Sequence, residues 1–239
     1  MPRRKVTIGK INFTLPCDNW ITHFRWYLIH KKEPEVRMFI DKYVRDSDIF
    51  FDIGANIGIY SIYASKRFTN LEAICFEPEF SNLHYLKQNI IENHLIDQMS
   101  AYSIAISDKV GTSKLYIQDT MPGAAIHSES IEKIETTAEG LPVVWSEGII
   151  AYTLDAIVQE LNKIPNIIKI DTDGNEAKIL RGAPKLLKNT ALRSLILEIP
   201  ENKQAAEECI ELLTKANFML DWTREDSRNQ IWVRKDKMG

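Results

Sequence analysis

Residues 49–61 read Ile49-Phe50-Phe51-Asp52-Ile53-Gly54-Ala55-Asn56-Ile57-Gly58-Ile59-Tyr60-Ser61, and the rest of the chain is best interpreted outward from them. A short apolar run ends at an acid, passes through two glycines and continues as an amphipathic segment, Ile57 to Phe68. This pattern predicts a buried strand, a tight turn and the start of a helix. Gly54 permits a backbone conformation closed to other residues, and Gly58 permits close helix–strand packing. The first N–H groups of the helix should therefore face an anionic or electron-rich ligand.

The spacing of the glycines separates two classes of nucleotide ligand. A dinucleotide site requires Gly-x-Gly-x-x-Gly, so that the backbone can touch a pyrophosphate. Counting from Gly54, the second and third glycines are replaced by Asn56 and Ile59. The pattern Asp-x-Gly-x-Asn-x-Gly suits a ligand whose carboxylate binds the helix N-terminus and whose ammonium binds Asp52. S-adenosylmethionine (SAM) carries both groups, and a structural turn without a ligand is the alternative.

A second acid supports SAM. The predicted strand Leu71 to Phe76 ends at Glu77 and Pro78, and Pro78 directs the chain into the next helix. An acid about 20 residues after a glycine turn is where a carboxylate binds a ribose diol. The adenosine of SAM has this ribose and no pyrophosphate. The spacing of Glu77 thus favours a ribose-binding carboxylate over a surface glutamate.

Three segments together resemble the FkbM family of SAM-dependent methyltransferases: residues 52–58, residues 76–78, and residues 168–176 followed by Leu180-Arg181-Gly182-Ala183. The resemblance covers about residues 49–199. It implies an α/β, Rossmann-like class I methyltransferase fold with a seven-stranded, mostly parallel sheet and helices on both faces. It also implies methyl transfer to an oxygen, often a hydroxyl of a sugar or polyketide. One departure is Asp173, which replaces the glutamate of the family's usual Asp-x-Glu-Gly.

Length and composition limit the domain organisation. A chain of 239 residues with 44% apolar content can bury one large α/β core and a small appendage. We expect an N-terminal appendage at residues 1–45 and the methyltransferase domain at residues 46–239. Four aromatic residues of the appendage could equally stack on a sugar ring or pack against the core: Trp20, Phe24, Trp26 and Tyr27.

Charge and cysteine content limit the partners and the compartment. A net charge of −3 and the lack of an Asn-Pro-Pro-aromatic segment argue against nucleic acid as a partner. The three cysteines lie far apart and form no metal-ligand pair, which favours a reducing compartment. No apolar run approaches the roughly 18 residues of a membrane span, and no signal peptide is evident, so we expect a cytoplasmic protein. The sequence predicts no oligomeric state.

The remaining pattern predicts alternating strands and helices. Residues 6–15 read as a short hairpin or an edge strand, and Thr153 should cap a helix. Pro184 must interrupt a helix that begins at Glu176. The other expected strands are residues 100–106, 111–118, 141–153, 166–170 and 194–197, with a closing antiparallel pair at 218–221 and 230–233.

The end of the third predicted strand should lie near the adenine. Ala105 and Ile106 would contact it, and Ser107 or Asp108 would meet its amino group. Asp108 could instead simply begin the turn that follows. The complete predicted cofactor set is Asp52, Gly54, Ala55, Asn56, Gly58, Tyr60, Glu77, Pro78, Ala105, Ile106, Asp108 and Asp171.

Methyl transfer to a hydroxyl benefits from a base within hydrogen-bond reach. Asp171 is the first candidate because it ends the strand beside Asp52, and Glu198, at the end of the next strand, would orient the acceptor. His127 is a second candidate base, in a polar loop at residues 119–140 that we expect to close over the acceptor. Asp173 and Glu176 either complete an acidic cluster or cap a helix. A divalent cation such as Mg²⁺ on these carboxylates is the less favoured alternative to a metal-free site.

The sequence therefore predicts a SAM-dependent O-methyltransferase that acts on a small-molecule, sugar, glycan or polyketide-type acceptor. One alternative is a SAM-binding module without catalysis. An NAD-linked oxidoreductase is disfavoured by the missing glycines. Acceptor specificity should reside in the appendage and in the loop at residues 119–140.

Overall fold

The computed structural model describes residues 2–130, 135–136 and 141–237, and its centre is a seven-stranded sheet. The sheet has the order β12-β13-β11-β10-β3-β4-β5, and its parallel part runs from β11 to β5. β13 is antiparallel to both β11 and β12. The strands are β3 (Ile49–Ile53), β4 (Glu72–Phe76), β5 (Met99–Tyr102), β10 (Ile167–Ile170), β11 (Ser194–Glu198), β12 (Phe218–Arg224) and β13 (Ser227–Arg234). The predicted fold class is confirmed.

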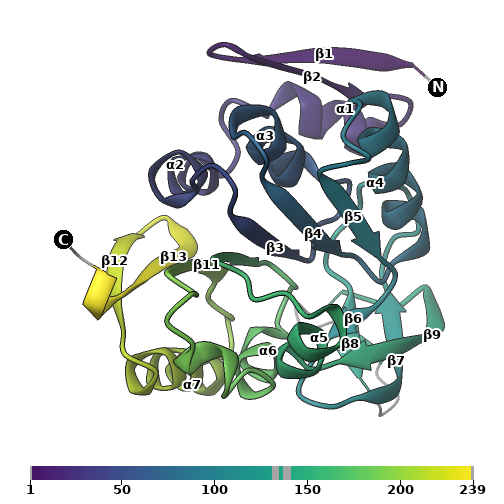
Figure 1. Cartoon of the computed structure of the whole chain (residues 1–239). Coiled ribbons are helices and arrows are strands. Elements are labelled where there is room, and N and C mark those ends of the chain that lie inside the picture. Colours follow the sequence, from purple (N-terminus) through teal and green to yellow (C-terminus); the bar gives the residue numbers. More distant parts are fainter. Residues whose placement is uncertain (1, 131–134, 137–140, 238–239) are drawn as a thin grey trace.

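Helices cover both faces of this sheet (Figure 1). The alternation of side chains along β3 explains why, because Phe50 belongs to one hydrophobic cluster and Phe51 to the other. The first cluster joins the sheet to α2 (Pro34–Tyr43), α3 (Ile59–Arg67) and α4 (Phe80–Glu92). The second joins it to α5 (Leu154–Leu161), α6 (Glu176–Arg181), the 3₁₀ turn η1 (Leu186–Lys188) and α7 (Lys203–Lys215). The last element is a second 3₁₀ turn, η2 (Lys235–Lys237).

The N-terminal elements pack on the α3–α4 side. β1 (Arg3–Ile8) and β2 (Ile11–Pro16) form the predicted hairpin, and α1 (Trp20–Tyr27) follows it. Figure 1 shows the hairpin lying across the outer side of α3 and α4. Phe13 and Leu15 of β2 are buried in the same cluster as Ile62 and Leu86. The hairpin thus shares the core of the main domain, and a boundary near residue 45 stays a prediction.

The predicted third strand at residues 100–106 is wrong in its second half. The chain leaves the main sheet after β5, and β6 (Ala105–Ile106) pairs in parallel with β9 (Trp145–Tyr152). The N–H of Ser107 extends this pairing to the carbonyl of Tyr152 at 2.8 Å. β6 therefore belongs to a second sheet, of order β6-β9-β7-β8, with β7 (Gly111–Ile117) and β8 (Ser128–Ser130). Of the predicted loop at residues 119–140, residues 131–134 and 137–140 lie outside the described residues.

Two local predictions are confirmed. The side chain of Thr153 accepts a hydrogen bond from the N–H of Ala156 and so caps α5. α6 ends at Arg181, and the chain just after Pro184 forms only the short 3₁₀ turn η1. Proline lacks the N–H that would continue the helix. The short α6 keeps the segment after β10 close to the sheet.

Candidate functional site

A cavity of about 420 Å³ lies beyond the carboxyl ends of β3, β4 and β10. This is where parallel α/β sheets bind ligands, and the volume falls in the range of small-molecule sites. Its lining includes eleven of the predicted site residues: Gly54, Ala55, Asn56, Tyr60, Glu77, Pro78, Ala105, Ile106, His127, Asp171 and Glu198. Three other predicted residues, Asp52, Gly58 and Asp108, do not line it. The fold thus brings most of the predicted set together around one space.

The turn after β3 forms the floor of the cavity. Gly54 has a φ of 73°, and a Cβ there would overlap the carbonyl oxygen of Asp171 at the end of β10. The N–H groups of Gly54 and Ala55 both donate to the carbonyl of Phe76, at 3.0 and 3.1 Å. The N–H of Asn56 donates to Glu77 at 2.7 Å. β4 and Glu77 thus accept the N–H groups of the turn, and the expectation that the first N–H groups of α3 (Ile59–Arg67) face a ligand stays a prediction.

Gly58 lies outside the cavity for a similar steric reason. Its φ is 82°, and a Cβ there would overlap the side chain of Leu86 on α4. Its close approach is therefore between the start of α3 and a neighbouring helix, whereas the sequence predicted an approach to a strand. Gly58 acts through packing, and the cavity wall beside it is formed by Ala55, Asn56 and Ile57.

Glu77 is fixed in place at the edge of the cavity. Its carboxylate accepts N–H groups from Asn56 at 2.7 Å and from Glu79 at 2.9 Å. Burial raises the pKa of Glu77 to about 8, although these two hydrogen bonds act to lower it. The side chain is only 5% exposed and still lines the cavity. One carboxylate oxygen is thus bound to the turn after β3 and the other to the turn after β4, which leaves the carboxylate in a position to accept hydrogen bonds from a ligand.

The predicted role of Asp52 is wrong. Asp52 is 1% exposed, and its carboxylate accepts hydrogen bonds from Ser61 Oγ at 2.6 Å and from Lys169 Nζ at 3.1 Å. The two residues are register partners on β3 and β10, so they project toward the same face of the sheet. Asp52 therefore binds a cation, but the cation is the buried ammonium of Lys169.

Lys169 connects Asp52 to the cavity. Its Nζ lies 3.3 Å from a carboxylate oxygen of Asp171 and 3.3 Å from the carbonyl oxygen of Gly54. Burial acts to lower the pKa of Lys169, but the charges of Asp52 and Asp171 outweigh it and the pKa is raised. Conversely, burial acts to raise the pKa of Asp171, and Lys169 outweighs it, so the pKa of Asp171 is lowered. Asp171 is thus an anion held in position at the end of β10.

Glu198 behaves in the opposite way. It ends β11, and its carboxylate lies 2.9 Å from a guanidinium nitrogen of Arg228. Burial and the neighbouring charge of Asp171 raise its pKa to about 8, against the attraction of Arg228. A carboxyl group with such a pKa can take up a proton near neutral pH, which Asp171 cannot do as readily.

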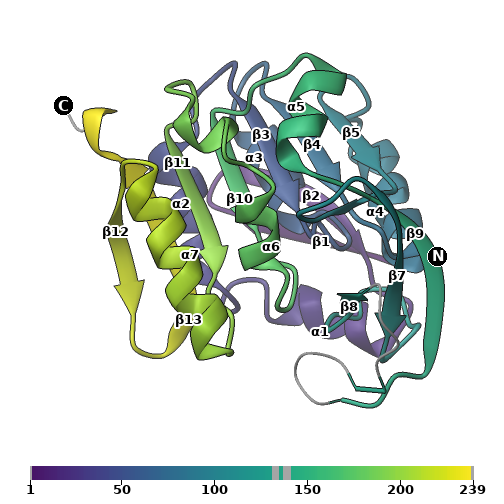
Figure 2. The same cartoon turned by 90° about the horizontal axis from the view of Figure 1, so that it is seen from below.

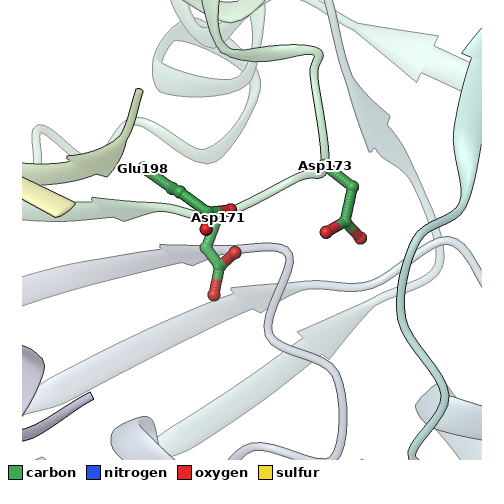
Figure 3. A group of neighbouring side chains, drawn as sticks. All are labelled: Asp171, Asp173 and Glu198. Atoms are coloured by element: carbon green, nitrogen blue, oxygen red, sulfur yellow. The ribbon is translucent and has the colours of Figure 1, made fainter. Parts of the chain in front are cut away.

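Asp171, Asp173 and Glu198 each offer a carboxylate oxygen, and these oxygens lie within 4.8 Å of one another (Figure 3). Oxygen ligands of this kind are what Mg²⁺ prefers. Each carboxylate also has a partner in the protein. Asp171 binds Lys169, Glu198 binds Arg228, and Asp173 accepts the N–H of Ile126 at 2.6 Å. The cluster is therefore stabilised by the protein itself as well as being able to hold a cation.

Residues 122–129, which we term the closing segment, run along the cavity and are fastened to several elements. Arg25 Nε of α1 donates to the carbonyl of Gly123 at 2.6 Å. The side-chain amides of Asn56 and Asn82 both donate to the carbonyl of Ala124, at 2.6 and 3.0 Å. At the other end, the Glu129 carboxylate binds Ser107, Ser113 and Lys178. The segment places Ala125, Ile126, His127 and Glu129 in the cavity lining.

His127 is on this segment, and both of its ring nitrogens are buried without a hydrogen-bond partner among the described residues. Burial lowers its pKa to about 4. The ring is therefore neutral at pH 7 and a weaker base than Glu198.

Glu176 and Asp108 do not line the cavity, and their carboxylates bind other parts of the protein. The Glu176 carboxylate accepts the N–H groups of Thr172 and Gly174, at 3.0 and 3.1 Å, and so fastens the loop before α6. Within the part of the chain that the structure describes, no side-chain capping bond forms at the start of α6, so a capping role for Glu176 stays a prediction. Asp108 follows β6 and accepts hydrogen bonds from Arg181 at 3.1 and 3.2 Å. The adenine contact predicted for Asp108 is not supported, because the residue does not line the cavity and its carboxylate is bound to Arg181.

Four cationic residues of the cavity lining were not predicted: Arg25, Lys32, Lys169 and Arg228. Lys169 had a signal in the sequence, because it interrupts the apolar run Ile167-Ile168-Lys169-Ile170 of a strand expected to be buried. The other three lie on helices, loops and strands far from the motifs, and nothing in their spacing marks them.

The family described as Methyltransferase FkbM domain matches residues 52–224 of this chain. The chain belongs to this family. Its relatives include Methyltransferase sdnD of Sordaria araneosa, which is 24% identical over 55% of this chain and 58% of that protein. Another is 31-O-demethyl-FK506 methyltransferase FkbM of Streptomyces tacrolimicus, 23% identical over 73% of this chain and 74% of that protein.

The chain spans less than two thirds of the Sordaria protein and 66% of Methyltransferase 1 of Beauveria bassiana. Solved structures of methyltransferases share its fold. They include the ribosomal protein L11 methylase of Lactobacillus delbrueckii, with a TM-score of 0.52, 11% identity and coverage of 86% and 79% of the two chains. Streptococcus pneumoniae Sp1610 in complex with S-adenosyl-L-methionine has a TM-score of 0.50, 13% identity and coverage of 84% and 71%. Within the described residues, none of the helices has the length and apolar character to cross a bilayer.

Proposed function

We propose that the protein is a SAM-dependent O-methyltransferase that acts on a hydroxyl of a small-molecule, sugar or polyketide-type acceptor. Membership of the FkbM family supports methyl transfer. The observation that carries the choice of SAM is Glu77, held by the turn after β3 at the edge of a cavity whose wall includes Ala105 and Ile106. A carboxylate beside an apolar wall suits a nucleoside, whose ribose diol donates hydrogen bonds and whose base is flat.

The described residues fit SAM in charge as well as in shape. Glu77 would accept the ribose hydroxyls, and Ala105 and Ile106 would contact the adenine. Asp171, an anion at the cavity wall, would bind the ammonium of the methionine part. Arg25 and Lys32 are lining cations that would attract its carboxylate. This assignment replaces the predicted role of Asp52.

When bound, SAM supplies a methyl group activated by the sulfonium. The protein must then position the acceptor hydroxyl in line with that methyl group and take up its proton. We assign uptake of the hydroxyl proton to Glu198, because its pKa of about 8 allows it to accept a proton near neutral pH. Asp171 would remain an anion that positions the bound SAM. His127 is the second candidate base, since the residue lines the same cavity and its buried ring nitrogens have no hydrogen-bond partner among the described residues.

Calorimetric titration with SAM tests the cofactor. The wild type should bind, and Glu77→Ala should weaken binding about tenfold or more, because leaving the buried ribose hydroxyls without a hydrogen-bond partner costs roughly 1–3 kcal/mol. Glu72→Ala is the matched control, because Glu72 is partly exposed on the same strand. Absence of heat with the wild type, or equal affinity for NAD, would contradict the assignment. SAM binding without methyl release on any acceptor would favour a binding module.

A metal-assisted reaction is the second candidate, and the grouping of Asp171, Asp173 and Glu198 supports it. Turnover should be measured by mass spectrometry as a gain of one methyl on glycan, polyketide and RNA acceptors. Turnover that survives EDTA and does not increase with Mg²⁺ would support the metal-free site. Methylation of RNA alone would overturn the proposed acceptor class.

A further inference from the structure

Helix α1 presents its aromatic side chains to solvent. Trp20, Phe24 and Tyr27 are 65%, 51% and 66% exposed. Their spacing of four and three residues places them on one face of the helix, while Ile21 and Thr22 on the opposite face are buried. A helix of a globular domain normally turns its apolar face inward, so an aromatic face turned outward marks an interaction site.

Basic side chains border this aromatic face. The ring of His23 lies 5.5 Å from that of Trp26, and the guanidinium of Arg4 lies 5.6 Å from the centre of the Trp26 ring. Trp26 Nε1 also donates to the carbonyl of Lys5 at 3.0 Å. β1 therefore lies beside α1, next to the aromatic face, and Arg4 and Lys5 of β1 are exposed. Lys31, which is also exposed, follows its C-terminal end.

The net charge of residues 1–32, which include α1 and the hairpin, is opposite in sign to the net charge of residues 33–239. Residues 1–32 contain seven lysines and arginines and a single acid, Asp18, a net charge of +6. The whole chain carries −3, so the other residues together carry −9. The carboxylate of Asp18 accepts a hydrogen bond from Tyr85 at 2.7 Å, which directs it toward α4. An anionic partner would thus meet little opposing charge at this face.

We propose that this aromatic–basic face, made of Arg4, Lys5, Trp20, Phe24, Tyr27 and Lys31, binds the surface of an anionic lipid bilayer. Tryptophan and tyrosine place an apolar ring in the boundary region of a membrane and keep a polar group in water. Lysine and arginine beside them are attracted by anionic headgroups. Arg25 and Ile29, on α1 and just after it, line the cavity, so the docked protein would hold the cavity near the lipid surface.

Two other occupants are less compatible with the observed charges. A two-fold contact between copies of the chain would bring the basic residues of both copies together. A single-stranded nucleic acid would need a continuous basic groove along its backbone, whereas only Arg4, Lys5 and Lys31 of this face are basic and the chain after residue 32 is net negative. A bilayer surface needs only a few basic residues beside inserted rings, which is the combination found here.

Sedimentation with vesicles tests the proposal without any methyl transfer. The full chain should bind vesicles of phosphatidylcholine and phosphatidylserine, bind phosphatidylcholine alone at least about tenfold more weakly, and lose binding as salt is added. The variant Trp20→Ser/Phe24→Ser/Tyr27→Ser should lower the partition coefficient about tenfold or more. The matched control is Ile91→Ser/Ile96→Ser/Val110→Ser, since these side chains are 62%, 67% and 58% exposed elsewhere.

A charge series separates the basic contribution. Arg4→Gln/Lys5→Gln should weaken binding about tenfold, and Lys203→Gln/Lys215→Gln, on exposed parts of α7, should leave it unchanged. Equal binding by the wild type and the aromatic variant would overturn the proposal. So would a wild type that ignores vesicles but binds single-stranded RNA, or one that forms a dimer dissociated by the aromatic variant. Circular dichroism confirms that each variant is folded.

Discussion

At the scale of single residues, the chain keeps an ammonium group buried between two carboxylates. Lys169 is 3% exposed and bridges Asp52 and Asp171 at 3.1 and 3.3 Å. Removing one partner of a buried ion pair leaves an uncompensated charge, which typically costs about 3–5 kcal/mol. Lys169→Met should therefore lower the free energy of unfolding by that amount, measured by urea denaturation.

Two variants make this test specific. Asp52→Asn/Lys169→Met should lose less stability than Lys169→Met, because it removes one of the charges that would be stranded. Lys163→Met is the surface control: its partner Glu72 is partly exposed, and we expect a loss of at most about 1 kcal/mol. Equal losses for Lys163→Met and Lys169→Met would contradict the structural role of the buried pair.

The assignment of Glu198 as the base makes a pH prediction. Its pKa of about 8 lies above the ordinary value of 4.5, so at pH 7 the carboxyl is mostly protonated. Only the deprotonated form accepts a proton, so kcat of the wild type should rise with pH and level off above about 8. Glu198→Gln should lower kcat about 10²–10⁴-fold and abolish this rise.

Glu201→Gln is the control, because Glu201 binds the same Arg228 from an exposed position. The comparison is made on kcat across pH 6–9 at saturating SAM and acceptor. A Glu198→Gln enzyme with wild-type kcat, together with a large loss in His127→Gln, would transfer the role to His127.

At the scale of elements, the turn after β3 is the most constrained part of the site. A side chain at Gly54 would meet both an unfavourable φ of 73° and the carbonyl oxygen of Asp171. Gly54→Ala should therefore destabilise the protein by about 2–4 kcal/mol and weaken SAM binding, since the end of β10 would have to move. Gly148→Ala on β9 meets open space and should change stability by less than about 1 kcal/mol. Thermal unfolding with and without SAM measures both effects.

The same elements show what the sequence could and could not predict. The strand–turn–helix pattern at Gly54 and the acid at Glu77 are local signals, and both lie at the cavity. The pairing of Asp52 with Lys169 was not predictable, because it depends on the register of β3 against β10. The second sheet was missed for a related reason: residues 100–106 contain no glycine, proline or other break, and only the distant β9 decides that β6 leaves the main sheet.

At the scale of the whole molecule, the N-terminal hairpin is part of the core. Leu15 is fully buried in the cluster that includes α3 and α4. Leu15→Ala should lower the free energy of unfolding by about 2–5 kcal/mol, whereas Lys10→Ala at the exposed hairpin turn should change it by at most about 0.5 kcal/mol. Circular dichroism and tryptophan fluorescence should report one shared transition. Two separate transitions would instead indicate that residues 1–45 unfold on their own.

The uneven distribution of charge has a consequence for how the molecule approaches other bodies. With +6 in residues 1–32 and −9 in the remainder, the protein carries a permanent electric dipole moment whose positive end is at the hairpin and α1. Figures 1 and 2 show the hairpin on the opposite side of the main sheet from α6 and α7. In the field of a negatively charged surface such a molecule rotates before it arrives, within a distance of about one Debye length. Its encounters are therefore biased toward the orientation in which α1 leads.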